Sequence, residues 1–248
     1  MWKFFHQFAS PKWFFEFTQK IQPWVIIIIT SLMLYGLYVG LYASPEDYQQ
    51  GHSVRIMYIH VPAAFNSMMI YTMMAVCSAI GYIWRIKLAY MVAISAAPVG
   101  AAFTFLALVT GSIWGKPTWN TWWEWDARIT SELILLFLYL GYIALHDAIE
   151  DVQQADRVAG VLAMVGVVNI PIIHYSVYWW NSLHQKATIS KFEKPSIEGS
   201  MLEALLVMIA AHMLLAFMLI FYRTATEVLR RESKSRWVRE RKELEGGQ

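Results

Sequence analysis

The sequence predicts an all-α protein that crosses a membrane about six times. Of its 248 residues, 57% are hydrophobic and only 15% are charged, and the mean hydropathy is +0.40. An average soluble domain carries charge on about a quarter of its residues. In addition, long apolar segments recur along the chain, separated by shorter polar stretches. We therefore expect a single helical membrane domain over residues 1–248.

The spans follow from the length of these apolar segments, because a helix needs roughly 20 apolar residues to cross a bilayer. Six segments qualify, at about 23–43, 57–83, 89–113, 129–146, 157–178 and 201–222. Residues 1–22 mix aromatic residues with lysines and lack a small-residue cleavage site. They are expected to form an interfacial helical arm rather than a cleaved signal peptide.

The distribution of positive charge predicts the orientation of the chain. An even number of spans places both termini on one side of the membrane. Residues 223–248 are rich in arginine and lysine, and the short turn after the second span carries Arg85 and Lys87. The positive-inside rule therefore assigns both termini to the cytoplasm. The loops at 44–56, 114–128 and 179–200 are then expected outside. The basic tail is expected to lie against anionic lipid or a partner subunit.

Composition also excludes several kinds of site. The single cysteine, Cys77, lies within an apolar segment, so neither an intramolecular disulfide nor a cysteine-based zinc or iron–sulfur site is expected. The formal net charge of +2 gives no indication of nucleic-acid binding. The sequence lacks a phosphate-binding loop of the type Gly-x-x-x-x-Gly-Lys-Ser/Thr, so this chain is not expected to hydrolyse ATP.

The most unusual stretch is the expected outer loop at 114–128. It holds five of the chain's 12 tryptophans: Trp114, Trp119, Trp122, Trp123 and Trp125. An interfacial aromatic belt is one interpretation, but a belt spreads single rings over many helix ends. Here Asp126 and Arg128 lie among the rings, and charges at a membrane edge are costly unless they reach water, a partner or a ligand. Several aromatic rings next to a cation suit a large, flat, anionic ligand, because the rings can stack on it and the cation can pair with its negative charge.

The stretch follows a recognisable pattern. Trp-Gly-x-x-x-Trp-x-x-Trp-Trp-x-Trp-Asp-x-Arg, from Trp114 to Arg128, runs into Ile129-Thr130-Ser131-Glu132-Leu133. It resembles the tryptophan-rich WWD motif of a family of haem-handling proteins. Within that family the chain is similar to CcmC, from the bacterial multi-component cytochrome c maturation machinery, in length, number of spans and two histidines. The resemblance implies a multi-pass protein of the bacterial inner membrane that holds haem on the periplasmic side.

Histidines are the residues most suited to ligate haem iron. The chain has seven: His6, His52, His60, His146, His174, His184 and His212. The topology puts His60, at the outer end of the second span, and His184, in the third outer loop, on the same side as the tryptophans. By topology alone each is more often a structural residue than a ligand, and His52 and His174 remain spare candidates. The resemblance implies that His60 and His184 are the axial ligands of the iron.

The ligand implied is haem b, held without a covalent bond, because the sequence contains no Cys-x-x-Cys-His run. Arg55 and Arg128 are candidates to pair with the haem propionates. The alternatives are that Arg55 caps or snorkels at a helix end and that Arg128 pairs with Asp126. Asp126 is expected to orient a cation rather than to act as a catalytic acid.

The resemblance also implies partners. Haem would pass to the periplasmic haem chaperone CcmE, and the chain would join CcmA, CcmB and CcmD in an ABC-type complex. No independent enzyme activity is expected of the chain, and whether it promotes the covalent attachment of haem to its chaperone partner is left open by the sequence. Two other functions remain open. The chain could be a structural subunit whose tryptophan loop docks a partner. It could also be a substrate-conducting transporter, for which His212 is the main ionisable residue deep within a span.

Overall fold

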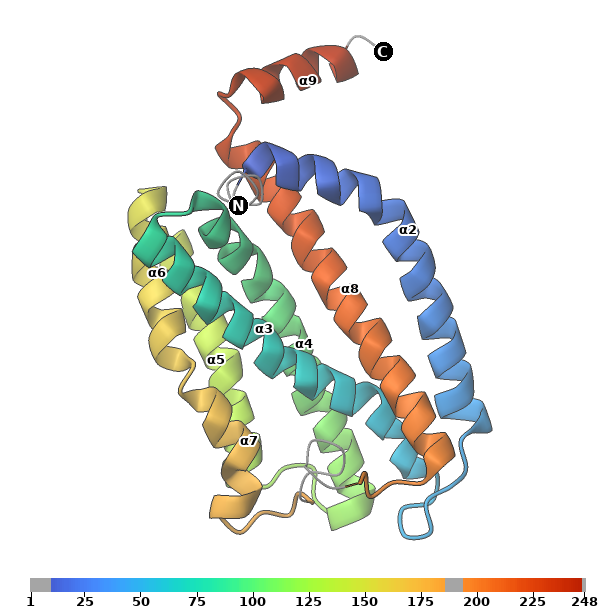
Figure 1. Ribbon diagram of the computed structural model, residues 1–248. Helices are drawn as coiled ribbons and strands as arrows, with labels where there is room; N and C mark the ends of the chain where they lie inside the picture. The colour runs from blue at the N-terminus through green and yellow to red at the C-terminus, as the bar shows by residue number, and fades with distance from the viewer. Residues whose placement is uncertain (1–9, 186–193, 247–248) are drawn as a thin grey trace.

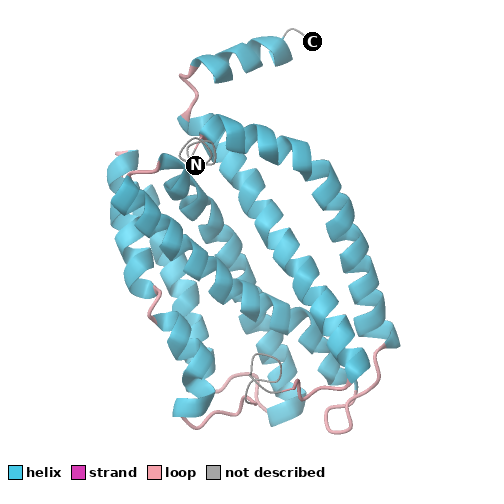
Figure 2. Ribbon diagram, in the orientation of Figure 1, coloured by secondary structure: helices cyan, strands magenta, loops and turns pink. Residues whose placement is uncertain are grey.

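The chain folds into long helices joined by short loops (Figure 1, Figure 2). The structure is a computed structural model, and it describes residues 10–185 and 194–246. Within these two ranges every regular element is helical and no strand occurs. The helices are α2 (Pro11–Tyr38), α3 (Met57–Trp84), α4 (Lys87–Trp119), α5 (Ala127–Asp147), α6 (Val152–Gly166), α7 (Asn169–Trp179), α8 (Gly199–Arg231) and α9 (Arg236–Gly246), with a π-helical turn η1 (Val39–Ala43) after α2 and a 3-10 turn η2 (His52–Ile56) before α3.

The number of spans predicted from the sequence is confirmed. Within the described residues, six helical segments are long and apolar enough to cross a membrane. They are Pro11–Ala43, His52–Trp84, Lys87–Trp119, Ala127–Asp147, Val152–Trp179 and Gly199–Arg231, and each contains one predicted segment. Figure 1 shows the two ends of this bundle. We call the end with the α4–α5 loop the Trp end, and the end with the α3–α4 turn and the end of α8 the basic end.

The first helix is longer than the sequence indicated. The Ser10 hydroxyl accepts the Trp13 N–H at 3.4 Å at its start, and α2 then continues through Pro23, so residues 11–22 and the first span form one helix. Figure 1 shows α2 bent, with its first turns crossing the end of α8. Phe14 and Phe15 are buried against α4 and α8. This part of the arm therefore packs on protein, and residues 1–9 lie outside the described residues.

The tryptophan loop is shorter than predicted. The sequence placed the loop at 114–128, but α4 continues through Pro117 to Trp119 and ends only at Asn120, whose φ of 59° lies in the left-handed region typical of helix ends. Trp114 and Trp119 are therefore helical. The loop proper covers residues 120–126, and Arg128 belongs to the first turn of α5.

The fifth span is broken between α6 and α7. Pro171 has no N–H to donate to the carbonyl of Val167, which lies four residues earlier at the break. Just after the break, the buried Asn169 donates its side-chain amide to the Ser131 carbonyl of α5 at 2.8 Å. The bond anchors the start of α7 to α5 and holds α7 toward the Trp end.

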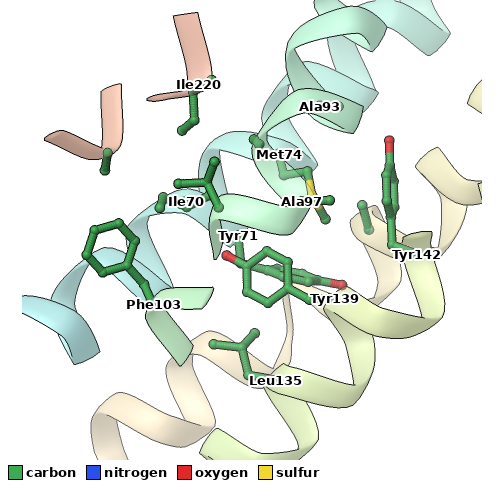
Figure 3. Packing of buried hydrophobic residues seen from close by; sticks show 14 of the residues in the cluster. Ile70, Tyr71, Met74, Ala93, Ala97, Phe103, Leu135, Tyr139, Tyr142 and Ile220 are labelled. Carbon is green, nitrogen blue, oxygen red and sulfur yellow. The ribbon is translucent and has the colours of Figure 1, made fainter. Parts of the chain in front are cut away.

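The core forms where α3, α4, α5 and α6 meet (Figure 3). Tyr71 of α3 and Tyr139 of α5 are fully buried and meet edge to face, with ring centroids 5.0 Å apart. Gly100 of α4 makes room for Tyr139, because a Cβ at this position would lie 2.2 Å from the tyrosine Cζ. The Tyr139 hydroxyl donates to the Ser67 carbonyl at 2.7 Å and ties α5 to α3. Small residues at such crossings let membrane helices approach closely.

Candidate ligand site

A cavity of about 500 Å³, counting its open mouth, lies at the Trp end of the bundle. Residues from α3, α4, α5, α7 and two loops line it, and they include His60, Trp122, Trp123, Arg128, Glu132 and His184. Two of the predicted tryptophans, one predicted arginine and both predicted histidines therefore meet in one place.

His60 lies in the first turn of α3 and packs against α4. Its Nδ1 is 3.0 Å from the Ala107 carbonyl oxygen and 3.1 Å from the Thr110 hydroxyl. A carbonyl oxygen only accepts, so Nδ1 carries the proton of the neutral ring. Nε2 is then unprotonated, and no residue in the described ranges hydrogen-bonds to it. Gly111 admits the ring this closely, because a Cβ there would lie 2.9 Å from the His60 Cε1.

His184 lies in the loop after α7 and is oriented by Asp126. Its Nδ1 lies 3.2 Å from the Asp126 Oδ2, which also accepts the Ser182 hydroxyl at 2.5 Å. The other carboxylate oxygen accepts the Ile129 N–H at 2.8 Å and caps the start of α5. A carboxylate bound to Nδ1 leaves Nε2 as the free nitrogen.

Asp126 is held in its charged form. Burial by itself raises the pKa of this carboxyl, but the hydrogen bonds from His184, the Ile129 N–H and Ser182 outweigh burial and leave the pKa below its usual range. The negative charge is therefore present at neutral pH, where it can keep His184 in place.

The five tryptophans divide into two groups by position. Trp122 and Trp123 line the cavity, and the exposed Trp125 contacts the Trp123 ring edge-on at 5.4 Å between centroids. Trp114 and Trp119 do not line it. They contact the two histidine rings instead, Trp114 against His60 at 5.7 Å and Trp119 against His184 at 4.7 Å.

Arg128 and Glu132 add two ionisable side chains to the cavity wall. They stand four residues apart on α5 and interact electrostatically, as Arg128 also does with Asp126. Glu132 is buried and accepts the Ser67 hydroxyl of α3 at 2.6 Å. In the described part of the chain, nothing hydrogen-bonds to the Arg128 guanidinium or pairs with it within salt-bridge distance. The group is therefore free to bind an anionic ligand in the cavity.

Arg55 lies apart from the cavity lining. It donates to the Ser44 carbonyl at 3.1 Å and so holds the loop before η2, which is the capping role that the sequence left open. His52 and His174 also stay outside the lining, His52 at 2.8 Å from Glu46 and His174 against the Tyr175 ring.

His212 lies in a different part of the molecule. Its Nδ1 donates to the Met208 carbonyl at 2.8 Å, and its side chain faces a groove between α4 and α8 that also contacts Phe103 and Arg223.

Several residues of the site escaped the sequence analysis. Gly111 and Ser182 position the histidines, and Ser67 binds Glu132, although no motif marks them. The one available signal was Gly111, because an isolated glycine inside a helical pattern often marks a close approach.

Comparison with known proteins shows the family of the chain. A family model described as CcmC, heme exporter protein C, matches residues 4–239. The chain is 47% identical over 239 residues to heme exporter protein C of Haemophilus influenzae, covering 96% of this chain and 97% of that one. It is 48% identical over 240 residues to the protein of that name from Escherichia coli K12, with 97% of each covered. The Paracoccus denitrificans relative is 41% identical over 235 residues, covering 94% of this chain and 97% of its own. The chain therefore belongs to the CcmC family.

Proposed function

We propose that this chain is the haem-holding subunit of a haem export and cytochrome c maturation system. It binds haem b without a covalent bond at the Trp end, with the His60 and His184 Nε2 atoms as the two axial ligands of the iron. The name of its relatives, heme exporter protein C, supports haem as the cargo. The bound haem supplies an iron with two open axial positions, to which imidazole is a usual ligand.

One observation carries the proposal. His60 and His184 come from distant parts of the chain, yet they line the same cavity, and an acceptor holds Nδ1 of each. Metal-binding histidines usually have their second nitrogen fixed in this way, because it sets the tautomer and the ring orientation.

The rest of the lining fits a flat, anionic ligand. Trp122 and Trp123 offer aromatic surface for a porphyrin, and the unpaired Arg128 guanidinium suits a propionate. Trp114 and Trp119 brace the two histidine rings from outside the lining. Arg55 lies outside the lining and donates to the Ser44 carbonyl, and its pairing with a propionate stays a prediction.

The positive-inside prediction puts the Trp end on the periplasmic side of the inner membrane. There the chain presents haem to the periplasmic haem chaperone CcmE, and it assembles with CcmA, CcmB and CcmD in an ABC-type complex. Energy from ATP enters through a partner, because this sequence has no phosphate-binding loop. The exposed Trp125 next to the cavity provides a contact for the arriving chaperone.

The visible spectrum of the detergent-purified protein tests the proposal. The wild type is expected to show a Soret band, with split α and β bands after reduction, and His60→Ala and His184→Ala are each expected to lose it. His52→Ala is the matched control, because this exposed histidine precedes α3 but stays outside the cavity. Colour that survives both cavity variants would overturn the ligand assignment.

A second function has one observation in its favour. Trp125, Trp179 and Trp180 are more than half exposed, and tryptophan is a favoured anchor at protein interfaces. A structural subunit that docks a partner through these rings would purify colourless and would bind no added haem. The same spectrum therefore separates the two functions.

A further inference from the structure

A second and larger cavity lies at the basic end, opposite the histidine site. It encloses about 1650 Å³, counting the space open to solvent. The end of α3 and the following turn, the first turns of α4 and α6, and the end of α8 surround it. These elements meet at the upper left of Figure 1.

The lining is strongly basic. Five cations contribute to it, namely Arg85, Lys87, Arg157, Arg230 and Arg231, against the two carboxylates of Asp156 and Glu232. Arg230 is already paired with Glu227. In the described part of the chain, the side chains of Arg85, Lys87 and Arg157 have neither a hydrogen bond nor an ion pair. Three exposed cations thus line one cavity without an ion pair, and the lining keeps an excess of positive charge over its two carboxylates.

An ion pair joins two of the helices that line the cavity. Asp156, which is buried, binds Arg231 through both carboxylate oxygens at 2.5 and 3.0 Å and also contacts the His146 Nε2 at 3.1 Å. This two-bond pair fixes the start of α6 to the end of α8. It also occupies the Asp156 carboxylate, so that this group does not neutralise the three free cations.

The turn between α3 and α4 supplies two of the unpaired cations. Arg85 has a φ of 55°, in the left-handed region that non-glycine residues rarely adopt. Gly81 lets α4 pack close, because a Cβ there would lie 2.8 Å from the Tyr90 ring. This tight turn places Arg85 and Lys87 on the cavity together.

We propose that this cavity binds the phosphate headgroup of an anionic membrane phospholipid. A phosphate is the anion that three convergent, unpaired cations fit best, and basic pockets between membrane helices at the cytoplasmic side are typical headgroup sites. The surroundings favour a lipid over a free anion. Tyr82 and Trp84 are more than half exposed at the same end of α3, as expected for rings at the membrane interface beside acyl chains.

Native mass spectrometry of the full-length protein in detergent tests this proposal. The protein is mixed with dioleoylphosphatidylglycerol and, separately, with dioleoylphosphatidylcholine, which has no net charge. The wild type is expected to retain the anionic lipid preferentially. Each cation strengthens such binding about fivefold, so Arg85→Gln/Arg157→Gln should weaken it by about 25-fold.

Two controls keep the result interpretable. Lys116→Gln/Lys194→Gln removes the same charge from the opposite end of the molecule, outside the cavity and outside the basic tail, and it should retain the lipid. Arg85→Lys/Arg157→Lys keeps the charge and should also retain it, which separates lost binding from misfolding. Equal retention of the lipid by the wild type and the Gln double variant would overturn the proposal. The three cations would then be assigned to an acidic segment of a partner protein. Displacement of the lipid by excess inorganic phosphate would overturn it in favour of a free-anion site.

Discussion

Replacement of Asp126 by asparagine tests how His184 is held. Asparagine keeps one oxygen, which can still accept the Ile129 N–H, but it removes the charge and the second acceptor that now binds His184 and Ser182. Loss of such a supporting carboxylate weakens metal binding by about 10–100-fold. Haem affinity should therefore fall by about 1.4–2.8 kcal/mol.

The assay is a haem titration of the purified protein, followed by the Soret band, beside a thermal unfolding curve. Asp126→Ala is the comparison, because it also removes the cap of α5 and should cost about 1 kcal/mol of stability in addition. Asp126→Asn should therefore lose haem affinity while unfolding close to the wild-type temperature. Wild-type haem affinity in Asp126→Asn would refute the reasoning that His184 depends on this carboxylate.

The same carboxylate predicts a response to pH. The pKa of Asp126 is lower in the folded protein than in the unfolded chain, where an aspartate titrates at about 4. A lowered pKa contributes stability that is present above the unfolded value and is lost as pH falls through the folded value. The unfolding temperature of the wild type should thus drop more steeply below about pH 4 than that of Asp126→Asn. Parallel curves for the two proteins would contradict this assignment.

Two glycine substitutions give further predictions, with Gly141→Ala as their shared control because a Cβ there meets only an ordinary contact at 3.7 Å. Gly111→Ala would place a Cβ 2.9 Å from the His60 Cε1, so it should push the ring away and lower haem affinity about tenfold with little change in unfolding temperature. Gly100→Ala should instead lower the stability of the fold. Its Cβ would fall 2.2 Å from the buried Tyr139 ring, so the variant should lose about 1–3 kcal/mol of stability, visible as a lower unfolding temperature. If Gly141→Ala matched either variant, the packing argument would fail.

Hydropathy alone was enough to predict the membrane architecture. The apolar length of a segment is a local property, and in lipid a spanning segment must satisfy its own backbone groups, which leaves the helix as the usual solution. The ends of the spans were predicted less well, because they depend on contacts between helices and not on hydropathy alone. The extension of α4 through Pro117 to Trp119, and the burial of Phe14 and Phe15, depend on contacts that no local pattern records.

The candidate site was partly predictable for a similar reason. Topology and the tryptophan motif placed His60 and His184 at the same end of the molecule, because the side on which a loop lies follows from counting spans. Only the tertiary structure decided which nearby residues share the cavity. It brings Arg128 to the lining and ties Arg55 to Ser44 instead, although both arginines looked alike in the sequence.

The chemical state of the two histidines was also beyond the sequence. Composition and motif determined that the protein is a helical membrane protein with a dense aromatic and histidine-bearing end. The bonds that fix each Nδ1 join His60 to Ala107 of the next helix, and His184 to Asp126 across 58 residues of chain. Such pairings arise from the packing of helices against one another. For this reason the fold determines which nitrogen of each ring remains free to bind a ligand.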